Sequence, residues 1–241
     1  MGKRRHGIPR TLVVRVFQRE DGCAALEVGG VVQSIGAPAD ASEAAPGYWA
    51  AMLPEACPRR ALLLGVGGGT VARLLRDRCP ATEIVGIERD ERVLASARAE
   101  LGLDAIAGLR VVVEDAFVWV PVAAEQEPSS YDYVCLDLFE AGRLTLGTLA
   151  TGFLRQVATL LAPGGTLAVN LMVTRRTSEQ LHRLARVFEL ASTVPVRGNI
   201  VVHLRIAQPI GTADLSFTDA VGKMVPESAR RHAPAEGRND R

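Results

Sequence analysis

A run of apolar residues followed by several glycines constrains the fold of this chain more than any other stretch. Residues 61–66 (ALLLGV) lead into three further glycines, and residues 84–88 (IVGIE) follow after one predicted helix. A buried strand that ends in a turn with almost no side chains lets backbone approach a ligand closely, and the next helix directs free N–H groups at it. Glu88, which ends the second strand, is placed to accept hydrogen bonds from a ribose. The pattern predicts a nucleoside site.

The spacing of the glycines separates the classes of nucleotide. Gly65 is followed by Gly67, Gly68 and Gly69, and the β-branched Thr70 stands where a dinucleotide fingerprint needs a third small residue. The loop also lacks the lysine and following hydroxyl residue of a P-loop, which argues against a nucleoside triphosphate. It resembles the first motif of the class I S-adenosylmethionine-binding fold. The alternative is a glycine-rich strand-to-helix turn in some other α/β protein.

Composition fits one large core and excludes several partners. The 241 residues are 48% hydrophobic with a net charge of +1, so nothing in the charge favours nucleic acid. No apolar run approaches membrane length, and the basic start lacks a signal-peptide core, so we expect no membrane partner. The cysteines and histidines show no ligand spacing, which predicts free thiols in a reducing cytoplasm and no metal. The cysteines are Cys23, Cys57, Cys79 and Cys135.

The chain divides into four predicted segments. They are a small antiparallel β unit (1–40), a linker with a short helix (41–59), a nucleoside-binding α/β domain (60–210) and a polar, flexible tail (211–241).

Strands and helices alternate from residue 60, which predicts an α/β fold with a mostly parallel sheet covered by helices on both faces. The strands expected are 61–66, 83–88, 109–114, 131–137 and 166–171, with helices at 69–78, 90–101, 148–161 and 177–190. A final hairpin, 192–196 with 200–206, matches the antiparallel edge strand of a class I methyltransferase-type, Rossmann-like sheet.

Ligands of such sheets lie beyond the carboxyl ends of the strands, where the strand order reverses. Acidic residues close two further predicted strands there, at Asp115 and Asp137. Asp115 is placed to accept from an adenine amino group, and the amide of Ala116 to donate to a ring nitrogen. The alternative for Asp115 is a helix cap.

From about Val13 to Ile206 the chain resembles the spermidine synthase family of aminopropyltransferases and its diverged bacterial relatives. The resemblance is carried by residues 26–33 (LEVGGVVQ), the glycine loop, 87–90 (IERD), 114–116 (EDA), 131–137 (YDYVCLD) and 161–165 (LAPGG). It implies that Gln33 contacts the nucleoside donor, Glu88 its ribose and Asp115 its adenine. The alternative for Gln33 is an exposed residue that ends a strand. The family precedent also implies a homodimer.

Aminopropyl transfer needs a pocket that binds a cationic amine and takes a proton from it, because a free amine has a pKa of roughly 10. Asp137 and Glu140 keep the two acids of the family's Asp-x-x-Asp. Asp137 is the candidate general base, and Glu140 the candidate for holding the distal ammonium of a polyamine. Phe139 is a candidate for lining the pocket.

Three departures from the family leave other functions open. Gly68 stands where the family has an aspartate beside the donor's propylamine arm. Tyr48 matches the tyrosine of a short helix in the family, but the acidic residue of that helix is absent here. Arg197 stands where the family has an acceptor-binding tyrosine. The donor is therefore S-adenosylmethionine or its decarboxylated form. The alternatives to an aminopropyltransferase are a methyltransferase on a small molecule, with Arg197 meeting a carboxylate, and a nucleoside-binding protein without catalysis.

Overall fold

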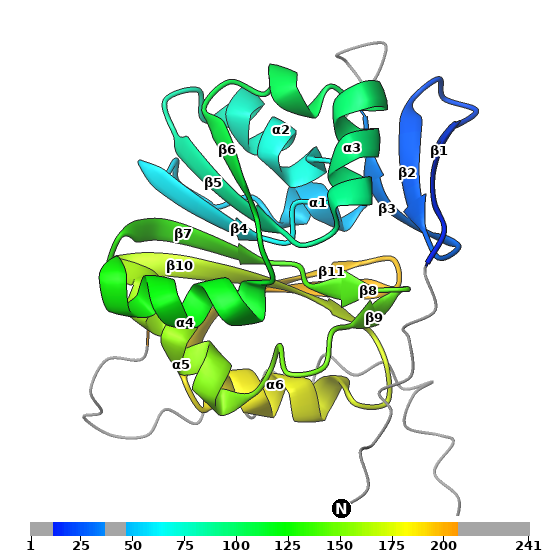
Figure 1. Cartoon of the computed structure of the whole chain (residues 1–241). Helices are drawn as coiled ribbons and strands as arrows, with labels where there is room; N and C mark the ends of the chain where they lie inside the picture. Colours follow the sequence, from blue (N-terminus) through cyan, green and yellow to red (C-terminus); the bar gives the residue numbers. More distant parts are fainter. Residues whose placement is uncertain (1–11, 37–46, 207–241) are drawn as a thin grey trace, which may run out of the picture.

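The computed structural model describes residues 12–36 and 47–206 (Figure 1). Its centre is a seven-stranded sheet in the order β11-β12-β10-β7-β4-β5-β6. Strands β4 to β7 and β10 are parallel, and β12 runs antiparallel to both of its neighbours. The strands are β4 (Arg60–Leu64), β5 (Glu83–Glu88), β6 (Leu109–Val113), β7 (Tyr131–Leu136), β10 (Leu161–Met172), β11 (Phe188–Val196) and β12 (Asn199–Ile206). The predicted α/β fold class is confirmed.

Helices cover both faces of this sheet because alternate residues of its central strands are buried in two different clusters. Leu62 and Leu64 of β4 join the cluster that contains α4, α5 and α6, whereas Ala61 and Leu63 join the cluster that contains α2 and α3. Figure 1 shows these two sets of helices on opposite sides of the strands. The helices are α1 (Tyr48–Ala51), α2 (Thr70–Arg78), α3 (Glu91–Glu100), α4 (Ala116–Gln126), α5 (Thr151–Leu160) and α6 (Thr177–Ala185).

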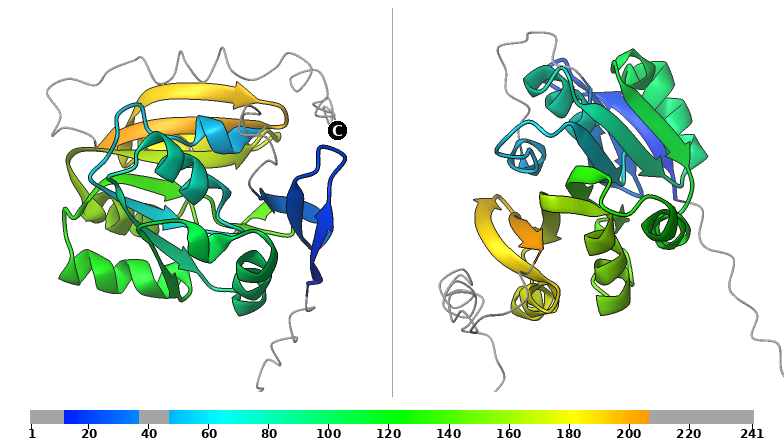
Figure 2. Two further views of the ribbon diagram at one scale, coloured as in Figure 1. Left: turned by 90° about the horizontal axis from the view of Figure 1, so that it is seen from above. Right: turned by 90° about the vertical axis from the view of Figure 1, so that its left-hand side faces the viewer.

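A small antiparallel sheet of β1 (Val14–Gln18), β2 (Ala24–Val28) and β3 (Val31–Ile35) lies beside α3 (Figures 1 and 2). Its last strand, β3, forms hydrogen bonds with the glycine loop and with the first residue of α2. The amide of Ile35 donates to the Thr70 hydroxyl at 2.8 Å, and the same hydroxyl donates to the Ile35 carbonyl at 2.9 Å. The hydroxyl of Ser34 accepts from the amide of Gly68 at 2.6 Å. The small sheet is thereby held against the start of α2.

Several elements differ from the sequence predictions. Helix α4 was not predicted, because Pro121 lies within it and few polar residues mark a helical period. It also missed the short hairpin of β8 (Phe139–Glu140) and β9 (Arg143–Leu144). Helix α6 ends at Ala185, and β11 begins at Phe188, within the residues predicted for that helix. The predicted tail (211–241), and most of the predicted linker before α1, lie outside the described residues.

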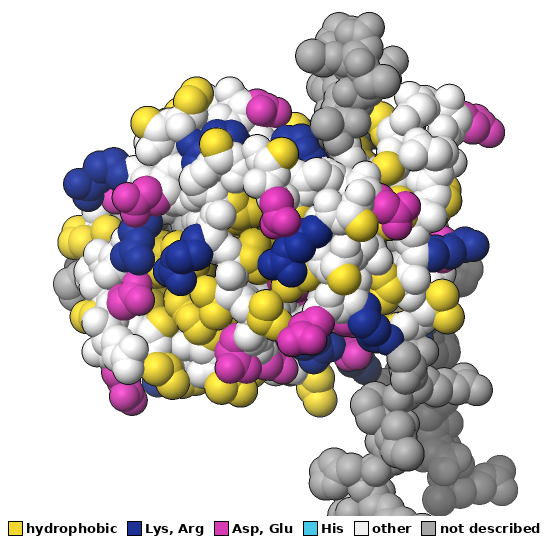
Figure 3. All heavy atoms as spheres, turned by 45° about the horizontal axis from the view of Figure 1, so that its top comes forward, with side chains coloured by type: hydrophobic (Ala, Val, Ile, Leu, Met, Phe, Trp, Pro, Cys, Tyr) yellow, Lys and Arg dark blue, Asp and Glu magenta, His cyan; other side chains and the backbone are white. Residues whose placement is uncertain are grey.

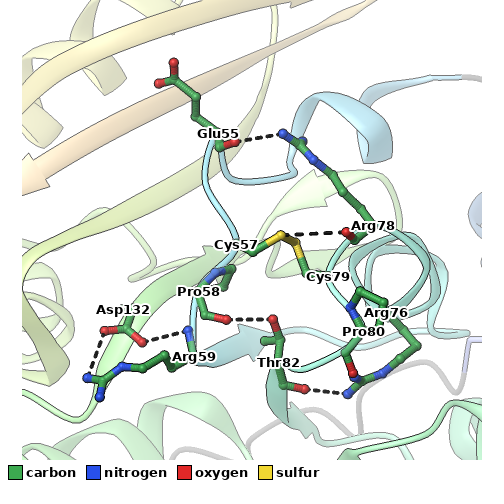
Figure 4. Close-up of a disulfide and its surroundings, with 10 residues drawn as sticks. All are labelled: Glu55, Cys57, Pro58, Arg59, Arg76, Arg78, Cys79, Pro80, Thr82 and Asp132. Carbon is green, nitrogen blue, oxygen red and sulfur yellow. Dashed lines mark hydrogen bonds and ion pairs between the residues drawn. A yellow bond between two sulfur atoms is a disulfide. The ribbon is translucent and has the colours of Figure 1, made fainter.

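Cys57 and Cys79 form a disulfide, so the prediction that all four cysteines are free thiols is wrong (Figure 4). The bridge joins the segment before β4 to the end of α2, at the amino ends of the strands. The Thr82 hydroxyl donates to the Pro58 carbonyl at 2.6 Å beside it. The sequence could not reveal the pair, because its separation of 22 residues matches no cysteine motif.

The charges on the face drawn in Figure 3 are mixed, with arginines beside acids rather than gathered in one patch. Among residues 12–36 and 47–206, no helix is both long and apolar enough to cross a membrane.

Candidate active site

A cavity of about 380 Å³ opens at the carboxyl ends of the parallel strands. Strand β3, helix α1 and the β8–β9 hairpin complete its wall. The predicted site residues that line it are Gln33, Tyr48, Gly65, Gly67, Glu88, Asp115, Ala116, Asp137 and Phe139. The cavity thus brings together side chains from most of the predicted strand ends.

Gly65 is required at the floor of the cavity. Its φ is +92°, a conformation that favours glycine, and a Cβ placed on it would collide with the backbone carbonyl of Asp137. The glycine loop after β4 and the end of β7 therefore touch through backbone alone. A donor molecule bound on the loop would lie directly beside Asp137.

Gly68 and Gly69 are not among the residues that line the cavity. A Cβ on Gly68 would come within 2.6 Å of Leu101 and 2.7 Å of Ser34, so this position faces β3 and α3. Gly69 faces Leu103 and Ile106 in the same way. Both glycines allow close packing behind the loop, which differs from the direct donor contact expected of them.

Glu88 holds the loop as well as lining the cavity. One carboxylate oxygen accepts from the amide of Gly67 at 2.9 Å, and the other accepts from the amide of Asp90 at 3.1 Å. Each oxygen keeps a further lone pair for a ligand hydroxyl. The half-buried acid is therefore held in place by the backbone of its own neighbourhood.

Asp115 is the N-cap of α4, as the alternative interpretation had it. Its Oδ1 accepts from the amide of Phe117 at 2.8 Å, and its Oδ2 lies 3.7 Å from the Arg89 guanidinium. The cap aims the first turn of α4, including Ala116, at the cavity. Capping and ligand binding are compatible here, since Asp115 still lines the cavity.

Asp137 lies at the centre of a hydrogen-bonded network. Its Oδ1 accepts from the Asn170 amide at 3.0 Å, and its Oδ2 accepts from the Tyr48 hydroxyl at 3.1 Å. The oxygen of Asn170 accepts in turn from the amide of Asn199 at 2.8 Å. Burial raises the pKa of Asp137 to about 6, and the bonds from Asn170 and Tyr48 act in the opposite direction. The sequence pattern did not reveal Asn199.

Two contacts hold α1, and with it Tyr48, over the sheet. The Tyr133 hydroxyl donates to the carbonyl of Met52, and Nε2 of His203 lies 2.8 Å from the carbonyl of Ala51. Burial, followed by the charge of Asp137, raises the pKa of Tyr48. Tyr48 is therefore a neutral hydrogen-bond donor toward Asp137.

Glu140 is not among the residues that line the cavity, contrary to the acceptor-binding role expected for it. It lies on β8, and its carboxylate is 3.1 Å from the Arg89 guanidinium. Arg143, its cross-strand partner on β9, does line the cavity. The sequence did not reveal the pairing of Arg89 with Glu140 or the place of Arg143 in the cavity wall, because both depend on how the β8–β9 hairpin folds over the strand ends.

Arg197 also lies outside the lining of the cavity, in the exposed turn between β11 and β12. Asn199, two residues later, lines it instead. Within the described part of the chain, no group of three or more His, Cys, Asp or Glu side chains is arranged to hold a metal ion.

The sequence matches the model of the methyltransferase small domain family over residues 46–203, more than half of the chain. The chain belongs to this family. The matched region runs from just before α1 into β12, and so includes the glycine loop, Glu88, Asp115 and the Asp137 network.

Curated relatives cover only parts of the chain. A polyamine aminopropyltransferase of Mycobacterium tuberculosis is 37% identical over 118 residues, which are 46% of this chain and 22% of that protein. A trans-aconitate 2-methyltransferase of Variovorax paradoxus is 31% identical over 162 residues, 67% of this chain and 51% of that protein. The chain thus spans about half or less of the length of these relatives.

A solved structure shares the fold over nearly the whole chain. A probable spermidine synthase from Corynebacterium glutamicum superposes with a TM-score of 0.68 at 20% identity, covering 95% of this chain and 94% of that one. The resemblance found in the sequence therefore extends to the fold.

Proposed function

We propose that this protein binds an S-adenosylmethionine-type sulfonium nucleoside in the cavity and transfers an alkyl group from it to a small amine. One observation carries the proposal. Asp137, with a pKa raised to about 6, lies in the same cavity as the glycine loop and Glu88, and the loop contacts its backbone. A proton acceptor thus adjoins a surface shaped for a nucleoside.

The donor side of the cavity comprises the ends of β4, β5 and β6. Here the backbone at Gly65 and Gly67 approaches the donor, Glu88 accepts from the ribose hydroxyls, and Asp115 accepts from the adenine amino group. Gln33 of β3 contacts the nucleoside from the opposite wall.

The acceptor side comprises the end of β7, β10 and the start of β12. Asp137 first takes a proton from the acceptor's ammonium group, which frees the lone pair of the nitrogen. The nitrogen then attacks the carbon beside the sulfonium, the carbon–sulfur bond breaks, and the thioether leaves with the bonding electrons. A base whose pKa lies near the working pH suits the proton transfer.

Aminopropyl transfer from decarboxylated S-adenosylmethionine to a polyamine is the first form of this activity. The aminopropyltransferase relative and the likeness to a spermidine synthase support it. In solution, we further propose a homodimer, which size-exclusion chromatography with light scattering would test.

Methyl transfer from intact S-adenosylmethionine to a small molecule is the second form, and one observation favours it. Glu140, the acid expected to hold a second ammonium, pairs with Arg89 and does not line the cavity, whereas Arg89 and Arg143 both line it. A guanidinium repels a diamine and attracts a carboxylate. The trans-aconitate methyltransferase relatives agree with this form.

Isothermal titration with S-adenosylmethionine, its decarboxylated form and methylthioadenosine tests the proposal. We expect all three to bind at one site per chain. Absence of binding by all three would overturn the proposed function. Incubation of the better donor with small amines, followed by mass spectrometry, then distinguishes a gained methyl group from a gained aminopropyl group.

A further inference from the structure

We infer that Asn199 positions Asn170 so that a hydrogen-bond donor always faces Asp137, and that this pair of amides thereby sets the proton affinity of the proposed base. The role in catalysis rests on the proposed function. The effect on the proton of Asp137 does not, because it follows from the hydrogen bonds alone.

The amide group of an asparagine has two chemically different sides. Asn170 presents an oxygen on one side and an NH₂ group on the other, and rotation by half a turn exchanges them. Asn199 donates to the oxygen of Asn170 at 2.8 Å, and this bond is possible only when the NH₂ group faces Asp137. Asn170 is 1% exposed, so bulk water does not offer it other partners.

Both oxygens of Asp137 consequently receive donors, Oδ1 from Asn170 and Oδ2 from Tyr48. Donors stabilise a carboxylate. A reversed Asn170 would turn its oxygen toward Oδ1, and two acceptors can share that contact only if Asp137 carries a proton. Asn199 therefore keeps Asp137 able to accept a proton from a bound amine.

The titratable groups closest to Asp137 carry no charge that would shift its pKa. Tyr133 and Cys135 of β7 are buried and Tyr48 of α1 is half-buried, and desolvation raises the pKa of each, so all three are neutral at pH 7. Arg143 lines the same cavity from β9. Burial and the two hydrogen bonds alone account for the shift of the pKa of Asp137 to about 6.

The fold brings the pair together across two strands. Asn170 and Asn199 are 29 residues apart, and the antiparallel pairing of β10 with β12 aligns Met172 with Asn199 and Asn170 with Val201. Asn199 also lines the cavity. A substitution at Asn199 would thus change the pKa of Asp137 through Asn170, without a direct contact between Asn199 and Asp137.

The first test measures the pKa of Asp137 in the protein without any ligand. The full chain is labelled at the carboxyl carbons of aspartate, and the Asp137 resonance, assigned by its loss in Asp137→Asn, is followed against pH by NMR. Asn199→Leu should raise the midpoint by one pH unit or more, which leaves about fivefold less ionised Asp137 at pH 6. Asn170→Leu should move it in the same direction.

Two variants serve as controls. Asn199→Gln keeps an amide donor and should restore a midpoint closer to that of the unaltered protein than Asn199→Leu does. Ser192→Ala, on β11 of the same hairpin, should change nothing. If Asn199→Leu does not fold, Asn199→Ala takes its place. An unchanged midpoint in a folded Asn199 variant without an amide would overturn the inference.

The second test uses turnover with the acceptor that mass spectrometry identifies. Asn199→Leu should lower kcat/KM about fivefold or more at pH 6 and approach the unaltered rate at higher pH, because the base is ionised there. An equal loss at every pH would mean that Asn199 has only a structural role. Failure of methylthioadenosine to bind would overturn the proposed function and leave the NMR result unaffected.

Discussion

Glu88 accepts a hydrogen bond from the backbone amide of Gly67 at 2.9 Å, so the acid that ends β5 fixes the loop that ends β4. The residue expected to bind the ribose therefore also shapes the floor of the site. Its loss should affect binding in two ways, by removing ligand contacts and by releasing the loop.

Glu88→Ala should weaken the binding of methylthioadenosine by roughly 1.5 to 3 kcal/mol for each charge-assisted hydrogen bond lost. Isothermal titration measures this change. Glu83→Ala is the matched control, because Glu83 is an exposed acid at the other end of β5. Equal affinity in a folded Glu88→Ala protein would rule out the ribose contact.

Asp137→Asn should lower turnover by about 10² to 10⁴, the usual range for a lost general base. The substitution keeps the size of the side chain, so the affinity for the donor should change little. Steady-state kinetics and donor titration on the same preparation measure both quantities. A parallel loss of affinity and turnover would make Asp137 a donor-binding residue instead.

The same substitution should stabilise the fold at neutral pH. Burial raises the pKa of Asp137 from a usual value of 3.8 to about 6, so its contribution to stability is full below pH 3.8 and is lost as the pH rises through about 6. Asp137→Asn removes this cost, and its free energy of unfolding at pH 7 should increase by about 1 to 3 kcal/mol. Urea unfolding at pH 4 and pH 7 tests the sign. A gain that is larger at pH 4 would contradict it.

The donor should keep its carboxylate. Gly68 supplies no acid for a propylammonium group and packs against Ser34, so intact S-adenosylmethionine should bind at least as tightly as the decarboxylated form. Titration of both compounds gives the ratio. A tenfold preference for the decarboxylated donor, about 1.4 kcal/mol, would favour aminopropyl transfer instead.

The Cys57–Cys79 bridge should stabilise the protein only under oxidising conditions. Closing a loop of 22 residues in the unfolded chain contributes about 3 kcal/mol in the chain-entropy description. Reduction should therefore lower Tm by several degrees. A double variant, Cys57→Ser with Cys79→Ser, should show the lower Tm with or without reductant. A Tm insensitive to reductant in the unaltered protein would contradict this prediction.

The parts of the molecule that were predicted from the sequence are those fixed by short-range pattern. The run at residues 61–66 predicted β4 because a strand buried on both faces is continuously apolar. Its carboxyl end then located the cavity. Gly65, Glu88 and Asp137 line that cavity because each follows or ends such a strand.

The parts that escaped prediction depend on contacts between distant segments. Asn199 contacts Asn170 only because β10 pairs with β12, and no local sequence pattern at either residue predicts this contact. Arg143 lines the cavity because the short β8–β9 hairpin folds over the carboxyl ends of the strands. The disulfide likewise requires the end of α2 to approach the segment before β4. None of these contacts has a periodic signature in the chain.

The contact between Gly65 and the backbone of Asp137 limits how a site of this kind can be redesigned or diversify. Because no side chain fits between them, the glycine loop and the end of β7 form a single unit whose residues cannot be exchanged one at a time. New ligands must be accommodated through the β8–β9 hairpin, whose Phe139 and Arg143 side chains line the cavity. Directed evolution toward another acceptor should accumulate its changes there and leave position 65 as glycine.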